Sequence, residues 1–344
     1  MIGMGTIATL CRFGGDVGWG HLTRCSALMN VAKARGWKTG LWTTSDCGKA
    51  GSDRLASFDT LLSLEAYTFE KISQSNPKAD VLLIDEMHLP DDFFGEARQL
   101  ADTIGAKVVA MDDLGTRSLQ SVDLAVNTEI GLRKANYAAR SLALGESFCL
   151  LRPGFKQAKR RNWPLDPEAI PVLIMIGGAD RSLAGLRALE ALKRFPGSKR
   201  FAPIYVSGDG SGLGQIELEL ADFVEHRLEV GIGDCALADW IATARFGITG
   251  CGSSVFEFAA LKTPFVGIVV ADNQVRTSQS ASRLWSMPIA NGRDPTKTAL
   301  AALIGLAVKE LVDRLDDGQP FAFGGVDAMG AERLMDRIET LSTG

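Results

Sequence analysis

The chain has 344 residues, with 37 Lys and Arg against 41 Asp and Glu, and a formal net charge of −4 at pH 7. At ~100–200 residues per domain, this length indicates about two domains. Hydrophobic residues make up 46% and charged residues 23%, which excludes a mainly disordered chain, and the mildly acidic charge lacks the basic excess typical of nucleic-acid binding. Glycine is in excess: its 37 residues are about 11% of the chain, against a usual ~7%.

The cysteine and histidine content argues against disulfides and against a zinc site. The six cysteines are scattered with no C-x-x-C pair, and the three histidines show no H-x-x-x-H spacing. We therefore expect reduced thiols, a cytoplasmic location, and neither a metal nor another cofactor. The N-terminus lacks the basic and apolar regions of a signal peptide, and no apolar run reaches ~18 residues, so no stable membrane insertion is expected.

In the first half of the chain, apolar runs alternate with helical patterns. Strands are expected at 6–11, 39–43, 81–85, 107–112 and 124–127, and helices at 21–35 and 93–104. The apolar runs lack alternation with polar residues, which is typical of strands buried on both faces of a parallel sheet. Residues 1–155 are therefore predicted to form a Rossmann-like domain.

The stretch 156–171 interrupts this alternation. It is basic, contains three prolines and shows no amphipathic period, so we predict a linker there. The pattern then resumes, with strands expected at 172–176, 201–206, 246–249 and 265–270, and helices at 183–195, 235–244, 255–261, 297–315 and 331–341. Residues 172–344 are predicted to form a second Rossmann-like domain, whose last helices could pack back on the first. The two parallel sheets are expected to face each other across a cleft.

A glycine-rich loop, Gly14–Gly20, follows the first strand and opens the helix that begins near His21. Glycines let backbone N–H groups approach an anion, and a helix N-terminus favours negative charge. The loop lacks the dinucleotide G-x-G-x-x-G fingerprint. A histidine at its mouth is a candidate general base, because imidazole titrates near neutral pH. The alternative is that His21 caps the helix or bonds a backbone carbonyl.

A second glycine turn, Gly250–Ser254, lies between the strand 246–249 and a helix. Its amides and its two serine hydroxyls could hold a diphosphate, and Glu257 could bond ribose hydroxyls. The alternative is a serine N-cap with Glu257 in a capping box. Residues 271–274, directly after the next strand, add three polar side chains at the same end of the sheet, or form an Asx turn.

Three further candidates have simpler structural explanations. Asp112 and Asp113 end a strand, where they could bind a metal or cap a helix. Gly177–Asp180 is either another phosphate-facing turn or a plain tight turn. Arg152 could reach the phosphate or carboxylate of a ligand, or lie on the surface.

Many of these motifs recur in the same order in one known family. They are Gly18-x-Gly20-His21-x-x-Arg24-Cys25, Asp112-Asp113, Leu150-Leu151-Arg152, Gly177-Gly178-x-Asp180, Gly252-Ser253-Ser254-x-x-Glu257 and Ala271-Asp272-Asn273-Gln274. Over about residues 6–340, the chain resembles the UDP-sugar hydrolases of pseudaminic acid biosynthesis (the PseG family), which are relatives of the MurG-like glycosyltransferases. The resemblance implies a GT-B fold, in which two Rossmann-like domains face each other.

The resemblance also implies an activity: water attacks the anomeric carbon of UDP-2,4-diacetamido-2,4,6-trideoxy-β-L-altropyranose with inversion, releasing UDP without a metal, for flagellin or surface-polysaccharide glycosylation. His21 occupies the position of the family's base. The expected partner is a small UDP-sugar, no nucleic-acid partner is expected, and a monomer is favoured. Substrate contacts are implied for Gly18, Gly20, Arg24, Asp85, Arg152, Gly177, Gly178, Gly252, Ser253, Ser254, Glu257, Asn273 and Gln274.

The chain departs from the family's pattern on the sugar side. The family's aspartate after Arg12 is absent, and Met87, followed by His88, stands in place of its active-site tyrosine. Two other functions therefore stay open. One is a GT-B glycosyltransferase with a sugar or lipid acceptor, for which Trp19 beside His21 is the only hint. The other is a catalytically silent nucleotide-sugar-binding protein.

Overall fold

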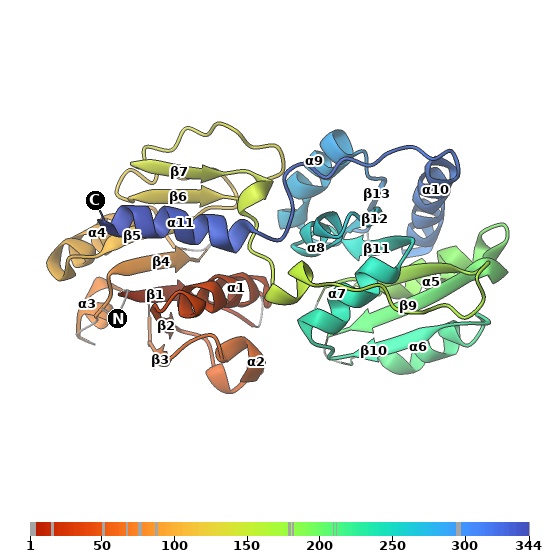
Figure 1. Cartoon of the computed structure of the whole chain (residues 1–344), viewed down its shortest axis with the longest axis horizontal. Coiled ribbons are helices and arrows are strands. Elements are labelled where there is room, and N and C mark those ends of the chain that lie inside the picture. Colours follow the sequence, from red (N-terminus) through yellow and green to blue (C-terminus); the bar gives the residue numbers. More distant parts are fainter. Residues whose placement is uncertain are drawn as a thin grey trace. The chain divides into compact units, whose positions relative to one another are not determined.

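The computed structural model describes residues 5–14, 17–49, 52–66, 68–74, 78–86, 89–177, 180, 182–208, 210, 212–293 and 297–343. The chain folds into two units, each built on a parallel sheet (Figure 1). Unit 1 comprises Met1–Arg152 and Ala328–Gly344, and unit 2 comprises Pro153–Asp327. No helix in the described part of the chain is both long and apolar enough to cross a membrane.

The sheet of unit 1 has the strand order β3-β2-β1-β4-β5-β6-β7, and every neighbouring pair is parallel. The strands are β1 (Thr6–Cys11), β2 (Lys38–Thr43), β3 (Thr60–Ser63), β4 (Val81–Asp85), β5 (Lys107–Met111), β6 (Leu124–Asn127) and β7 (Ser141–Leu144). The helices are α1 (Gly20–Ala34), η1 (Cys47–Lys49), α2 (Ser52–Leu55), α3 (Phe69–Gln74), α4 (Phe93–Ile104), η2 (Glu146–Phe148) and α11 (Gly330–Thr343).

Both faces of this sheet are buried, which explains why its central strands lack a polar face. Ile7 and Cys11 of β1 pack into one apolar cluster with α1 and α11, whereas Ala8 and Leu10 pack into another with α3 and α4. Successive side chains of a strand point to opposite faces, so one continuous apolar run serves both clusters.

The C-terminal helix α11 belongs to unit 1, where it lies against α1 (Figure 1). Arg35, which follows α1, donates to Asp336 at 2.7 Å and to Glu339 at 2.9 Å. The indole of Trp37 also donates to Glu339, at 3.3 Å. The chain therefore returns to its first unit after completing the second.

The sheet of unit 2 has the order β10-β9-β8-β11-β12-β13 and is again entirely parallel. Its strands are β8 (Ile170–Met175), β9 (Phe201–Ser207), β10 (Arg227–Val230), β11 (Phe246–Gly250), β12 (Phe265–Val269) and β13 (Ile289–Asn291). Its helices are η3 (Pro153–Lys156), α5 (Ala184–Arg194), η4 (Ser198–Arg200), α6 (Leu213–Leu220), α7 (Asp234–Thr243), α8 (Ser254–Ala260), η5 (Asp272–Gln274), α9 (Val275–Trp285) and α10 (Lys297–Asp316).

Helices cover both faces of this second sheet as well. Phe246 and Ile248 of β11 share an apolar cluster with α5, α6 and α10. Gly247, between them, faces the other side, where the ring of Phe258 from α8 occupies the space that a side chain would need. Phe256 of α8 also meets Trp285 of α9 edge to face, with ring centroids 6.0 Å apart.

The segment 156–171, expected to be a linker, lies within unit 2. The backbone N–H of Lys159 donates to Asp239 at 2.8 Å, and that of Arg161 donates to Thr243 at 2.8 Å, so both hold the segment on α7. The ring of Trp163 packs edge to face on Trp240. The prolines and basic residues thus mark a strap bound to α7, and the units divide at Arg152, before the strap begins.

Candidate functional site

The strand order of unit 1 reverses between β1 and β4; the glycine loop follows β1, and Asp85 is the last residue of β4. From β1 the chain builds outward through β2 and β3, and it then returns to the other side of β1 with β4. Ligands of open parallel sheets bind beyond the carboxyl ends of the strands at such a reversal. The strand order therefore brings His21 and Asp85 to this position in unit 1.

The glycine loop is closed by its own backbone. The N–H of Gly14 donates to the carbonyl of Gly18 at 2.7 Å, and the N–H of Gly18 donates back to the carbonyl of Gly14 at 3.1 Å. Both glycines have φ near +77°, a conformation that favours glycine. The Gly18 amide, expected to face an anion, is thus already bonded, whereas Gly20 is exposed at the start of α1.

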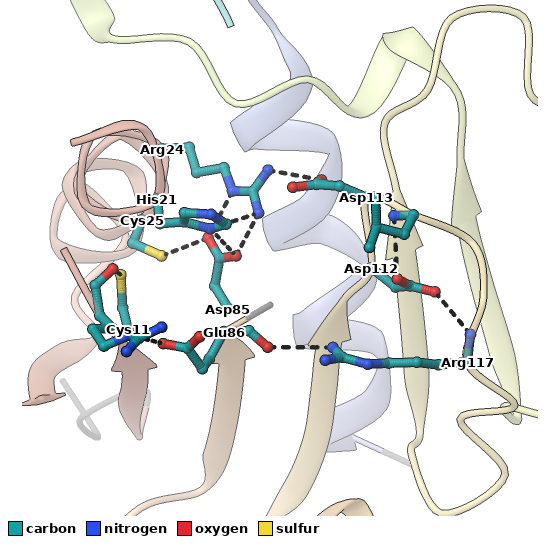
Figure 2. A network of polar contacts seen from close by, with 11 residues as sticks. Cys11, His21, Arg24, Cys25, Asp85, Glu86, Asp112, Asp113 and Arg117 are labelled. Carbon is teal, nitrogen blue, oxygen red and sulfur yellow. Dashed lines mark hydrogen bonds and ion pairs between the residues drawn. The ribbon is translucent and has the colours of Figure 1, made fainter. Parts of the chain in front are cut away.

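His21 is held by a buried carboxylate (Figure 2). Its Nδ1 lies 2.8 Å from Oδ1 of Asp85, and the Asp85 side chain is only 1% exposed. Burial alone would raise the pKa of Asp85, but the charge of Arg24 and the hydrogen bonds from Arg24 and His21 outweigh it and hold the pKa well below its ordinary value. An ionised carboxylate only accepts hydrogen bonds, so we assign the ring proton to Nδ1, which leaves the lone pair on Nε2.

Arg24 forms the other half of this network and links it to a second carboxylate (Figure 2). Its Nε donates to Oδ2 of Asp85 at 2.6 Å, its Nη2 donates to Oδ1 of the same residue, and its Nη1 donates to Asp113 at 2.8 Å. Burial opposes the charge of Arg24, but Asp113 and Asp85 outweigh it and raise its pKa well above the ordinary value. Arg24 and Asp85, implied as substrate contacts, thus have each other and His21 as their partners.

Two buried thiols complete the surroundings of Asp85. The Sγ of Cys25 donates to Oδ2 of Asp85 at 3.3 Å. A hydrogen bond with Cys11, together with burial, raises the pKa of Cys25 well above its ordinary value, so this thiol stays protonated and donates. The carboxylate thereby accepts hydrogen bonds from three residues, which fixes its orientation toward His21.

Asp112 and Asp113, adjacent in the sequence, have separate roles in the structure. Asp112 is buried and accepts from the Tyr137 hydroxyl at 3.0 Å and from the Leu114 N–H at 3.3 Å, whereas Asp113 pairs with Arg24. Among the described residues, no group of three or more His, Cys, Asp or Glu side chains is arranged to hold a metal ion. Asp112 therefore stabilises a turn rather than a helix start. Met87 and His88 lie outside the described residues.

Trp19, the one hint of an acceptor site, already has neighbours on its ring. The ring of Phe13 stacks on it with centroids 5.8 Å apart, and the guanidinium of Arg54 lies 5.0 Å from its centroid. Trp19 also occupies the N-cap position of α1 without a side-chain capping bond. These contacts give the indole a structural role next to His21.

In unit 2, the strand order reverses between β8 and β11, and the predicted turns follow these strands. Gly177 is exposed after β8, and Gly178 lies outside the described residues. Asp180 accepts from the N–H groups of Ala184 at 3.1 Å and Gly185 at 2.6 Å. Asp180 therefore satisfies amides at the start of α5 and acts as a helix cap.

The turns after β11 and β12 lie side by side. A Cβ placed on Gly252 would lie 3.7 Å from Nε2 of Gln274, whose Oε1 accepts from the Val270 N–H at 2.9 Å. Ser253 is the N-cap of α8 but makes no side-chain capping bond. Ser254 and Glu257 are each 8% exposed. The second and third predicted motifs therefore meet at one edge of the sheet.

Asn273 and Arg152 complete the set of predicted site residues. Asn273 is exposed in η5, beside Asp272, which pairs with Arg293 at 2.6 Å. Arg152 is half-buried and is the last residue of unit 1 before the chain enters unit 2. Asp113 is the member of the His21 network that the sequence interpretation did not connect to it, although its place after β5, beside β4, is a signal that could have found it.

Comparison with known proteins agrees with this architecture. No family model matches the chain. The spore coat polysaccharide biosynthesis protein SpsG of Bacillus subtilis is 22% identical over 271 residues, which cover 78% of each chain, and is a distant homologue. MurG of Acinetobacter baumannii aligns over 97% of this chain and 99% of its own, with 14% identity and a TM-score of 0.59. MnaA of S. aureus, in a co-structure with UDP, aligns over 98% and 97% with 12% identity and a TM-score of 0.62. The chain has the GT-B fold.

Proposed function

We propose that the protein is a nucleotide-sugar enzyme of polysaccharide biosynthesis that hydrolyses a UDP-linked 2,4-diacetamido-2,4,6-trideoxy sugar. The observation that carries this proposal is that Nδ1 of His21 lies 2.8 Å from the buried Asp85 at the strand-order reversal, an arrangement from which we assign the ring proton to Nδ1 and the lone pair to Nε2. A nitrogen oriented in this way is suited to take a proton from water. Homology to a polysaccharide biosynthesis protein and the fold shared with a protein bound to UDP support the substrate class.

In the proposed reaction, Nε2 of His21 removes a proton from a water molecule as its oxygen bonds to the anomeric carbon. The bond from that carbon to the diphosphate oxygen breaks, and UDP leaves with the electron pair. Because UDP is a good leaving group, the protein mainly has to activate water and stabilise the departing phosphate. Attack opposite to the leaving group inverts the configuration. Asp85 stabilises the imidazolium that forms.

Unit 2 supplies the nucleotide side of the proposal. In this proposal, Gly252, Ser253 and Ser254 in the turn after β11 bind the diphosphate, and Glu257 binds the ribose hydroxyls. The Ser253 hydroxyl is not used as a helix cap, which supports a role toward a ligand. Asn273 and Arg152 are proposed as further ligand contacts.

The test is UDP release by purified protein from the UDP-sugar in the presence of EDTA. We expect release by the wild type and a loss of about 10²-fold or more in His21→Gln, the range typical of a general base. His226→Gln is the matched control, because the ring of His226 contacts the carbonyl of Phe223 in unit 2, far along the chain from this network.

The same assay separates the other functions. Release that appears only when a sugar or lipid acceptor is added would identify a glycosyltransferase. UDP-sugar binding without release, with or without an acceptor, would identify a silent binding protein. Full release by His21→Gln would remove this histidine as the base.

A further inference from the structure

We infer that Arg24 is a positioning residue that sets the proton affinity of His21 through the shared carboxylate of Asp85, and that Asp113 adjusts how strongly it does so. This inference rests on the proposed role of His21 as a base. It assigns Arg24 of α1 to the control of His21 protonation rather than to substrate contact.

The geometry of Arg24 supports this role over direct substrate binding. Each of its three guanidinium nitrogens already donates to a carboxylate: Nε and Nη2 to Asp85, and Nη1 to Asp113. The Arg24 side chain is 19% exposed and that of Asp85 is 1% exposed, so this ion pair is largely shielded from solvent. Because the guanidinium of Arg24 is bound by carboxylates on two sides, it fixes the plane of the Asp85 carboxylate and thereby the direction from which this carboxylate contacts His21.

The charges around His21 act in opposite directions. Asp85, 2.8 Å from Nδ1, carries a negative charge that favours the imidazolium. The guanidinium of Arg24, with Nη2 only 3.1 Å from the same Nδ1, disfavours the imidazolium. Because Nδ1 is assigned as protonated, this short contact joins two donors, and its main effect is electrostatic.

Asp113 is the outer end of the network and its most exposed member. Its side chain is 34% exposed, and it neutralises part of the Arg24 charge. Other ionisable groups near the network are Glu86, which pairs with Arg12 at 3.3 Å, and the thiols of Cys11 and Cys25, whose raised pKa values keep them neutral. Asp85, Arg24 and Asp113 carry charges of alternating sign. Removing Arg24 and removing Asp113 should therefore shift the protonation of His21 in opposite directions.

The test follows His21 directly by ¹⁵N NMR of its imidazole in the full-length protein across pH. Only three histidines are present, so His88→Gln and His226→Gln assign the other two signals. We expect Arg24→Gln to raise the titration midpoint of His21 by about one pH unit or more, a tenfold change in proton affinity. Asp113→Asn is expected to lower the midpoint. The acid limb of the UDP-release profile should move in the same directions.

Controls keep the inference open to refutation. Arg98→Gln removes a cation from another ion pair of unit 1, to Asp123, and should leave the midpoint of His21 unchanged. If Arg24→Gln does not fold, Arg24→Lys retains the charge, and its midpoint should stay within a few tenths of a unit of the wild type. Midpoints that do not move, or that move in the same direction in the Arg24 and Asp113 variants, would overturn the inference.

This measurement needs no substrate, so its outcome is independent of the proposed hydrolysis. Opposite shifts without UDP release would uphold the network and refute the hydrolase. UDP release that depends on His21, without opposite shifts, would uphold the hydrolase and refute the role assigned to Arg24.

Discussion

Replacing Asp85 with asparagine should inactivate the proposed base by changing the tautomer of His21. The carboxylate accepts from His21 and Arg24 at Oδ1, and from Arg24 and Cys25 at Oδ2. An asparagine offers only one acceptor oxygen. If that oxygen faces Nε of Arg24, the amide N–H₂ faces Nδ1 of His21, which must then give up its proton and accept. The ring proton moves to Nε2, where it blocks proton removal from water.

The magnitudes follow from burial and from the role of the base. Removing one charge of a buried ion pair costs about 3–5 kcal/mol, and Asp113 still neutralises part of Arg24, so we expect a loss of about 3 kcal/mol in the free energy of unfolding. Loss of general-base catalysis is worth about 10²–10⁴ in rate. We expect kcat for UDP release to fall by at least about 10²-fold, with a smaller change in KM.

Asp123→Asn is the matched control for this prediction. Asp123 is as buried as Asp85 and pairs with two arginines of unit 1, Arg98 and Arg140, outside the His21 network. Its substitution should cost similar stability, measured by urea unfolding, while leaving kcat within about threefold of the wild type. The reasoning is refuted if folded Asp85→Asn keeps wild-type kcat, or if Asp123→Asn loses as much activity.

Three further predictions concern stability. Arg133 and the Gly131 N–H outweigh burial and lower the pKa of Glu146 to about 2. The contribution of Glu146 to the free energy of unfolding is therefore complete above about pH 5 and is lost as the pH falls toward 2. Glu146→Gln should therefore flatten the acid limb of a urea-unfolding series by about 1–2 kcal/mol, a value discounted because Arg133 is 62% exposed. Gly247→Ala should destabilise unit 2 by at least about 1–3 kcal/mol, because the new Cβ would lie 2.1 Å from the Phe258 ring. Gly305→Ala, in α10 with open space around it, should raise stability by about 0.5–1 kcal/mol. Thermal melts check both glycine variants: Gly247→Ala should lower Tm and Gly305→Ala should raise it.

The strands at the centre of each sheet could be predicted from the sequence. The expected bounds of β1, β4 and β6 agree with the structure, because a strand buried on both faces needs an unbroken apolar run. None of the four edge strands, β3, β7, β10 and β13, was predicted. In β3 and β10, which have only four residues each, every residue is half-exposed or exposed, so neither shows an apolar run or a clean alternation.

The sequence predicted individual residues of the candidate site but not the hydrogen bonds and ion pairs that join them. Local sequence marks the glycine loop and His21, because a strand, a glycine turn and a helix start follow one another within a few residues. It could not show that Asp85 and Asp113 reach the same arginine, because these residues are 28 positions apart and meet only when β4 and β5 pair. It also could not show that Asp180 caps α5 or that Gly18 bonds Gly14.

By itself the sequence determined the number of Rossmann-like halves, most of the central strands and helices, and the loops that carry glycine, because these depend on local periodicity and on backbone freedom. Tertiary structure decided three other matters: which unit the chain termini and the 156–171 strap join, which buried side chains surround Asp85, and which carboxylate His21 meets. These depend on contacts between residues far apart in the chain, and on burial, which makes one charge control the protonation of its neighbour.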